Sequence, residues 1–183
     1  MTKKQQKIKR PPLWIVIAMI LSMIIGIITA VVGINMIENY YHPYWFSIIF
    51  GGLGLIVGFI TAKRFKPYIA VNPKIKSDYG MAILYISTGF LGVFLLFGSL
   101  LNHRLSKIDN CDNYIVINKY RTESHYRQPE INSLIVNING KSQRLICSRD
   151  YWFRTSIGQN IDLCLHKSKL GFDFITLTND KRR

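Results

Sequence analysis

Three cysteines, Cys111, Cys147 and Cys164, lie in the C-terminal part of this chain, and one of them has titratable neighbours. In the segment NIDLCLHK, Asp162, Cys164 and His166 alternate, so a β-strand would place all three side chains on one face. Cys147 belongs to a separate predicted strand that could lie beside it. A thiol nucleophile with a histidine base, or a metal site, would be built from these four residues.

The spacing of these residues differs from that of established sites. The chain has no C-x-x-C or H-x-x-x-H pair, and side chains two residues apart on a strand lie ~7 Å apart, beyond hydrogen-bond reach. Phosphate-binding, dinucleotide-binding and serine-hydrolase motifs are also missing from the sequence. The sequence therefore predicts no catalytic residue, cofactor or metal. An odd number of cysteines allows at most one disulfide and one thiol.

A second group of charged residues surrounds a predicted helical turn. These residues are Arg144, Arg149, Asp150 and Arg154. They could bind an anion or simply solvate the surface, and the sequence favours solvation.

The segment that carries these groups, residues 113–183, predicts a small, mostly β domain with about five strands and one short helix. An OB-like or SH3-like barrel or a sandwich fits this number of strands. Its clearest element is a hairpin in LIVNINGKSQRLIC, which turns on Asn139-Gly140 and would bury Leu134, Val136 and Ile138. Residues 102–112 are predicted to be a polar linker.

The remaining elements of this domain are predicted from shorter patterns. Ser148 is a plausible N-cap for a short helix that would turn Trp152 and Phe153 toward the core, and Gly158 would stop it. Further strands are expected at residues 113–120, 160–167 and 172–178.

Three long apolar runs without any Lys, Arg, Asp or Glu precede this domain, at residues 13–37, 44–62 and 79–101. Each is roughly the 20 residues that a helix needs to cross a bilayer. The first run is too long for a signal peptide, so we expect it to be retained. The chain is therefore predicted to be a multi-pass membrane protein with a three-helix transmembrane region, residues 13–101.

The basic residues predict how these spans are oriented. Five of them lie in the first ten residues, within the basic N-terminal segment 1–12, and five lie between Lys63 and Lys76, whereas the loop Glu38–Pro43 has none. The positive-inside rule then places the N-terminus in the cytoplasm and the C-terminal domain outside it, which in a bacterium is the periplasm or the cell exterior. Tyr40, Tyr41, Tyr44 and Trp45 would form an interfacial aromatic belt.

Small residues recur at four-residue spacing within the spans, as expected where helices pack closely in a membrane. The positions most suited to helix packing are Gly26, Ala30, Gly54, Gly58 and Gly92. Packing within the three-helix bundle is favoured over a dedicated dimer interface.

The formal net charge of +14 is concentrated at the membrane edges, which favours a lipid bilayer over nucleic acid as partner. The spans carry no ion, unlike most transporters and pumps. We therefore expect a non-catalytic anchor that presents its β-domain to an envelope protein or to a second copy of itself. The alternatives are a membrane-bound thiol, redox or metal-dependent enzyme that uses the tail Cys and His residues, and an oligomeric pore or lipid-sensing subunit.

Overall fold

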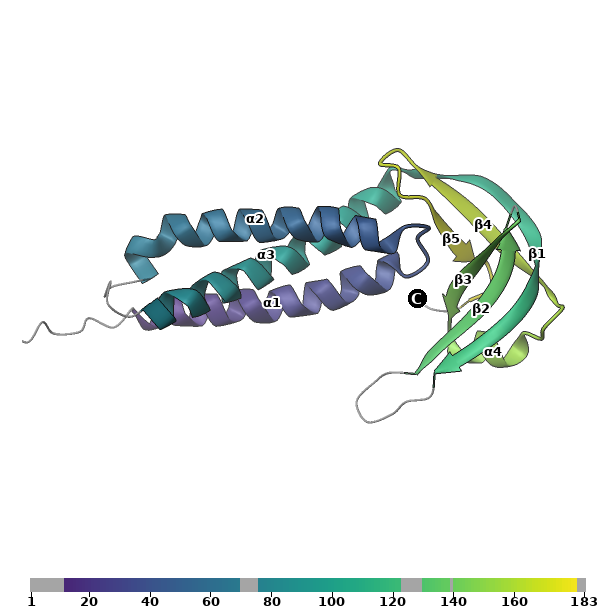
Figure 1. Cartoon of the computed structure of the whole chain (residues 1–183), viewed down its shortest axis with the longest axis horizontal. Helices are drawn as coiled ribbons and strands as arrows, with labels where there is room; N and C mark the ends of the chain where they lie inside the picture. Colours follow the sequence, from purple (N-terminus) through teal and green to yellow (C-terminus); the bar gives the residue numbers. More distant parts are fainter. Residues whose placement is uncertain (1–11, 70–75, 123–129, 139, 181–183) are drawn as a thin grey trace, which may run out of the picture. The chain divides into compact units, whose positions relative to one another are not determined.

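The computed structural model describes residues 12–69, 76–122, 130–138 and 140–180. Within it the chain divides into two compact units (Figure 1). The first, here called the helical unit, comprises Met1–Asn35 and Trp45–Ser99. The second, the β unit, comprises Met36–Tyr44 and Leu100–Arg183. The β unit is therefore built from two separate stretches of the chain.

Three long helices provide the candidate membrane spans. They are α1 (Leu13–Ile37), α2 (Pro43–Ile69) and α3 (Lys76–Arg104). All three are long and apolar enough to cross a membrane. The helix α1 has the same limits as the first apolar run, whereas α2 continues beyond residue 62 and through Pro67 to Ile69. A proline this close to the C-terminus of a helix leaves most of the preceding helix undisturbed, which is why it did not end α2 earlier.

Glycines bring the backbones of these helices close together. A Cβ atom on Gly54 would lie 2.7 Å from the Phe90 carbonyl oxygen, and one on Gly58 would lie 2.6 Å from the Cα of Ser87. A Cβ on Gly92 would collide with the carbonyl oxygen of Gly26. These four glycines therefore lie where α3 packs against α1 and α2. The fifth predicted packing residue, Ala30, is half-buried.

The β unit contains a single curled antiparallel sheet with the strand order β3-β2-β1-β4-β5, shaped like half a barrel (Figure 1). Its elements are β1 (Ser106–Thr122), β2 (Ile131–Ile138), β3 (Lys141–Cys147), α4 (Arg149–Arg154), β4 (Asn160–Ser168) and β5 (Phe174–Leu177). Five strands and one short helix confirm the predicted fold class. The half-barrel leaves β3 and β5 as the outer strands of the sheet.

The predicted linker at residues 102–112 is absent. Residues 102–104 end α3, and Ser106–Asp112 form the first part of β1, which pairs with β4. This part of β1 is exposed on both faces, so it lacks the alternation of apolar residues that identifies a half-buried strand. Pairing through the backbone, which any side chain allows, makes it a strand.

The predicted hairpin is confirmed. Ile138 of β2 pairs with Lys141 of β3, so two residues make the turn. Gly140 has a φ of 79°, and Asn139 lies outside the described residues. The side chains of Leu134, Val136 and Ile138 are all buried, as the register requires.

The core of the β unit combines these residues with Ile161 and Leu163 of β4, both of which are buried. Ser148 caps α4 by accepting a hydrogen bond from the Tyr151 backbone N–H. Trp152 packs against the core, but Phe153 does not, because its side chain is 54% exposed. The prediction that both rings face the core was therefore wrong for Phe153.

The loop between α1 and α2 belongs to the β unit and joins the two outer strands of its sheet. The Asn39 carbonyl accepts a hydrogen bond from the Ile175 N–H of β5 at 3.1 Å. The Asn39 side chain accepts from the Ile146 N–H of β3 at 2.9 Å and donates to the Ile146 carbonyl at 3.2 Å. A single asparagine thus satisfies backbone groups on both edges of the half-barrel.

Tyr40, beside it, is a core residue of the β unit. It is 1% exposed and stacks on Phe174 of β5 with ring centres 5.4 Å apart. Burial raises the pKa of its hydroxyl to about 12, although a hydrogen bond with Asn102 acts in the opposite direction. The expectation that Tyr40 belongs to an interfacial aromatic belt was therefore wrong.

Candidate functional site

Cys164 is joined to Cys111 by a disulfide between directly opposed residues of β4 and β1. The bond links positions 53 residues apart in the sequence. One disulfide and one remaining thiol agree with the limit set by three cysteines. Because a nucleophile or a metal ligand must be a thiolate, Cys164 has neither role while this bond exists.

Cys147 lies in a different part of the sheet. It is buried in β3, and its Sγ donates a weak hydrogen bond to the Asn132 carbonyl at 3.7 Å. Two strands, β2 and β1, separate β3 from β4, which carries Asp162, Cys164 and His166. The structure therefore does not bring Cys147 together with the other three residues of the predicted cluster.

His166 packs against aromatic and polar side chains of β5. Its ring stacks on Phe174 with centres 4.5 Å apart, and its Nε2 lies 2.8 Å from Thr176 Oγ1. Burial lowers the pKa of His166, and the charge of His103 lowers it further. Asp162 is exposed. Among the residues that the structure describes, no three His, Cys, Asp or Glu side chains are arranged to hold a metal ion.

A cavity of about 550 Å³ opens beside His166 within the β unit. Its lining includes two imidazoles, two carboxylates and two ammonium groups, from His42, His166, Asp109, Asp173, Lys141 and Lys167. Its size is within the usual range of ligand pockets, ~300–1,000 Å³. The mixture of charges suits a small polar molecule better than a strongly charged one.

Basic and aromatic side chains meet at α4, in what we call the α4 surface: Lys119, Arg121, Arg149, Trp152 and Phe153. The Lys119 Nζ lies 4.0 Å from the centre of the Trp152 ring. The guanidinium carbons of Arg121 and Arg149 lie 5.3 and 5.7 Å from the centre of the Phe153 ring. These distances are within the range of cation–π contacts. The exposed Phe153 ring is therefore flanked by two guanidinium groups.

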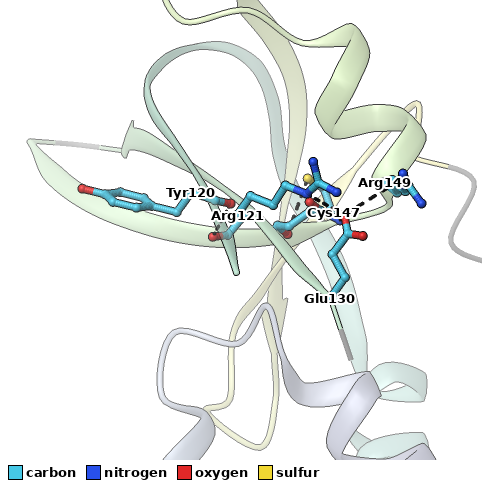
Figure 2. A network of polar contacts seen from close by, with 7 residues as sticks. Tyr120, Arg121, Glu130, Cys147 and Arg149 are labelled. Atoms are coloured by element: carbon cyan, nitrogen blue, oxygen red, sulfur yellow. Dashed lines mark hydrogen bonds and ion pairs between the residues drawn. The ribbon is translucent and has the colours of Figure 1, made fainter. Parts of the chain in front are cut away.

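One carboxylate, that of Glu130, organises these arginines, as Figure 2 shows. Arg121 Nε lies 3.0 Å and Arg149 Nε 4.0 Å from Glu130 Oε1. Asn132 donates a further hydrogen bond to the same oxygen at 3.0 Å. The Asn132 bond and the Arg121 contact lower the pKa of Glu130, which therefore stays ionised at neutral pH. Two guanidinium groups around one carboxylate leave the α4 surface positively charged.

Lys119 fixes the position of α4 itself. Its ammonium group donates hydrogen bonds to the backbone carbonyls of Trp152 and Thr155 at the C-terminal end of the helix. A cation is favourable there because it satisfies carbonyls that have no partner within the helix. Lys119 is therefore a structural part of the α4 surface, whereas the guanidinium of Arg149 is largely exposed, with 64% of its side chain accessible.

The sequence indicated only part of this surface. It singled out Arg144, Arg149, Asp150 and Arg154, but Arg144 bonds to Ser133 Oγ and Arg154 to the Asp150 carbonyl of its own helix. Lys119, Arg121 and Glu130 were missed because they reach α4 only through the pairing of β1 with β2. The signal that could have indicated them was the alternation of Lys119 and Arg121 at the end of a strand.

Comparison with known proteins gives no assignment for either unit. No family model, curated protein or solved structure matches the chain. Any function must therefore follow from the chemistry of these surfaces.

Proposed function

We propose that this chain is a non-catalytic, multi-pass membrane anchor that presents its β unit to an acidic protein partner outside the cytoplasm. The observation that carries the proposal is the α4 surface, where the exposed Phe153 ring lies between Arg121 and Arg149. Aromatic residues and arginine are the side chains most enriched at the energetic centres of protein interfaces. A partner would bury the Phe153 ring and place carboxylates against the guanidinium groups.

Two features support a location of the β unit outside the cytoplasm. Basic residues are concentrated before α1 and between α2 and α3, and the loop Glu38–Pro43 has none, so the positive-inside rule places the C-terminus outside. The disulfide between Cys111 and Cys164 suits an oxidising compartment, since the cytosol keeps most thiols reduced. Charge bias and redox chemistry are independent of each other and favour the same orientation.

Charge favours a different protein over a second copy of this chain as the partner. From residue 102 onward the chain has 14 Lys and Arg against 8 Asp and Glu. Two β units would therefore repel each other, whereas an acidic partner would be attracted and would associate faster.

The alternative of a thiol or redox enzyme has less support. A reactive thiolate is partly exposed in a basic environment. Cys147 is 1% exposed, and Cys111 and Cys164 are bonded to each other. The β unit is therefore better suited to binding than to thiol chemistry.

Site-specific cross-linking tests the proposed surface. A photoreactive phenylalanine analogue replaces Phe153 in the full-length chain expressed in its membrane, and a control places it at the exposed Lys169 in the β4–β5 turn. We expect a defined protein adduct at position 153 and none of the same size at 169. Arg149→Glu should lower the yield at 153 roughly tenfold, the equivalent of about 1.4 kcal/mol. Equal adducts at both positions, or no effect of Arg149→Glu, would contradict the proposal.

Fusion reporters test the orientation separately. A phosphatase that is active only after export, fused after Arg183, should be active, and a fluorescent protein that folds only in the cytoplasm should be dark at the same position. The reverse result would place the β unit in the cytoplasm.

A further inference from the structure

An apolar groove of about 380 Å³ crosses the surface of the helical unit. Side chains of all three helices line it, chiefly Trp14, Ala18 and Ser22 of α1, Thr61 and Phe65 of α2, and Phe90 of α3. Trp14, Ala18 and Ser22 follow one another at four-residue spacing and thus share one face of α1. The groove therefore runs lengthwise along the first two turns of α1 and beyond.

Part of the groove is lined by small side chains, those of Ala18, Ser22 and Thr61. Farther along α1, Gly26 contacts α3 backbone to backbone. Nearer its N-terminus, Ile15 packs with Ala62, Ala82 and Ile86 in a small buried cluster. Ala18 remains exposed above this cluster, so its short side chain leaves the space unfilled.

One end of the groove lies beside a basic residue. Arg64 follows Thr61 by three residues, so the two are neighbours on the surface of α2, and the exposed Arg64 side chain lies beside the lining residues without being one of them. Lys63 lies on the opposite side of the same helix, because two residues after Thr61 a helix has turned by about 200°. α2 contains no acidic residue. Trp14 lies at the same end, and its indole is the type of side chain that occurs at headgroup level.

We infer that this groove binds one acyl chain of an anionic phospholipid, whose headgroup phosphate is held by Arg64. The lining offers hydrocarbon contacts along the chain, and Arg64 offers a planar, permanently charged group that matches phosphate geometry. The basic segments at this end suit the leaflet that is rich in anionic lipid. The inference concerns the helical unit and is independent of the partner proposed for the β unit.

Native mass spectrometry of the full-length chain in mild detergent tests the inference. The probes are phosphatidylglycerol and phosphatidylcholine with identical acyl chains. We expect one tightly retained phospholipid per chain, and a preference of about fivefold for phosphatidylglycerol, as expected for one basic residue at an anionic headgroup.

Two pairs of variants separate the chain-binding groove from the headgroup contact. Ala18→Phe fills the groove and should abolish the retained lipid, whereas Val31→Phe, on the other side of α1, should not. Arg64→Gln should remove the preference for phosphatidylglycerol, whereas Lys63→Gln should leave it intact. If Ala18→Phe retains lipid at the wild-type level, the groove is not the site that binds the acyl chain. If both glutamine variants lose the preference for phosphatidylglycerol equally, Arg64 does not hold the headgroup. Both substitutions are at exposed positions of the helix, so this result would not reflect a folding defect.

Discussion

In the helical unit, Gly26, Gly54 and Gly58 bring backbones into contact, whereas in the β unit large side chains such as Leu134, Leu145 and Leu163 fill a core. This difference is the one expected between helices that pack in lipid and a sheet that packs in water. Lipid tails are as apolar as leucine, so burying a leucine between membrane helices gains little, and close van der Waals packing becomes the main source of stability. In water the same leucine gains from the hydrophobic effect. We therefore expect that removing a large buried side chain destabilises the β unit, whereas adding a side chain at a contact glycine destabilises the helical unit.

The largest expected effect is that of Tyr40→Ala. Tyr40 lies between two candidate spans, yet it fills the core of the β unit, so its removal should destabilise that unit by roughly 3–5 kcal/mol. Membrane insertion of α1 and α2 should be unchanged, since it depends on their apolar length. Protease resistance of the β unit measures the effect. Tyr44→Ala, at an 82% exposed ring, is the control and should change stability by less than about 0.5 kcal/mol. Similar effects of the two variants would show that the loop is not part of the β unit.

Gly92→Leu should destabilise the helical unit and leave the β unit unchanged. The added side chain would collide with the Gly26 carbonyl and separate α1 from α3, at a cost of roughly 1–3 kcal/mol to the helical unit. Unfolding in detergent mixtures, followed by helix–helix proximity, measures it. The matched control is Gly80→Leu in the same helix, where no atom of the described residues, apart from the chain neighbours and the backbone of α3 itself, lies within 4 Å of the added Cβ. If both variants unfold alike, close backbone packing does not hold the helices together.

Gly140→Val should destabilise the β unit by roughly 1–2 kcal/mol. The φ of 79° is a left-handed conformation that a β-branched residue strongly disfavours. Among the described residues, leaving out the chain neighbours of Gly140, no atom lies within 4 Å of an added Cβ. Thermal unfolding of the full chain measures the loss. Ser142→Val, two residues later at an exposed strand position, should be nearly neutral. A neutral Gly140→Val would mean that the turn has a different geometry.

The smallest effect concerns acid. The folded pKa of His166 is lowered below its ordinary value of 6.5 because burial disfavours the imidazolium. The unfolded chain therefore binds a proton first as the pH falls, and the β unit should lose stability progressively below about pH 6.5. The helical unit should not respond in this range. Melting temperatures at pH 7.5 and 5.5 measure the loss, and His166→Asn should flatten it. If the melting temperature of His166→Asn falls as much between pH 7.5 and 5.5 as that of the wild type, another group causes the pH dependence.

Much of the fold was predictable because it depends on local pattern. The three spans follow from uninterrupted apolar length, and the register of β2 and β3 follows from a two-residue turn between alternating strands. Ser148 was recognisable as an N-cap from its position before a short helix. At the candidate site, the sequence pointed to Arg149 but not to the residues that surround it.

The rest required the tertiary structure, because it depends on which segments meet. The first half of β1 is polar on both faces, and only β4 makes it a strand. Which cysteine bonds to Cys164 follows from the register that places Cys111 directly opposite.

The sequence by itself determined that this chain has three helices long and apolar enough to cross a membrane, since the length of an apolar run and the absence of charge within it are local properties. The role of the loop between α1 and α2 was decided by tertiary structure alone. In the sequence, Asn39 is a polar loop residue and Tyr40 is an aromatic residue beside a span. In the structure, Asn39 hydrogen-bonds to Ile146 and Tyr40 stacks on Phe174, in strands more than a hundred residues later in the chain. The unpaired backbone groups at the edges of a half-barrel must be satisfied, and the chain satisfies those of Ile146 and Ile175 with a segment that no local pattern marks.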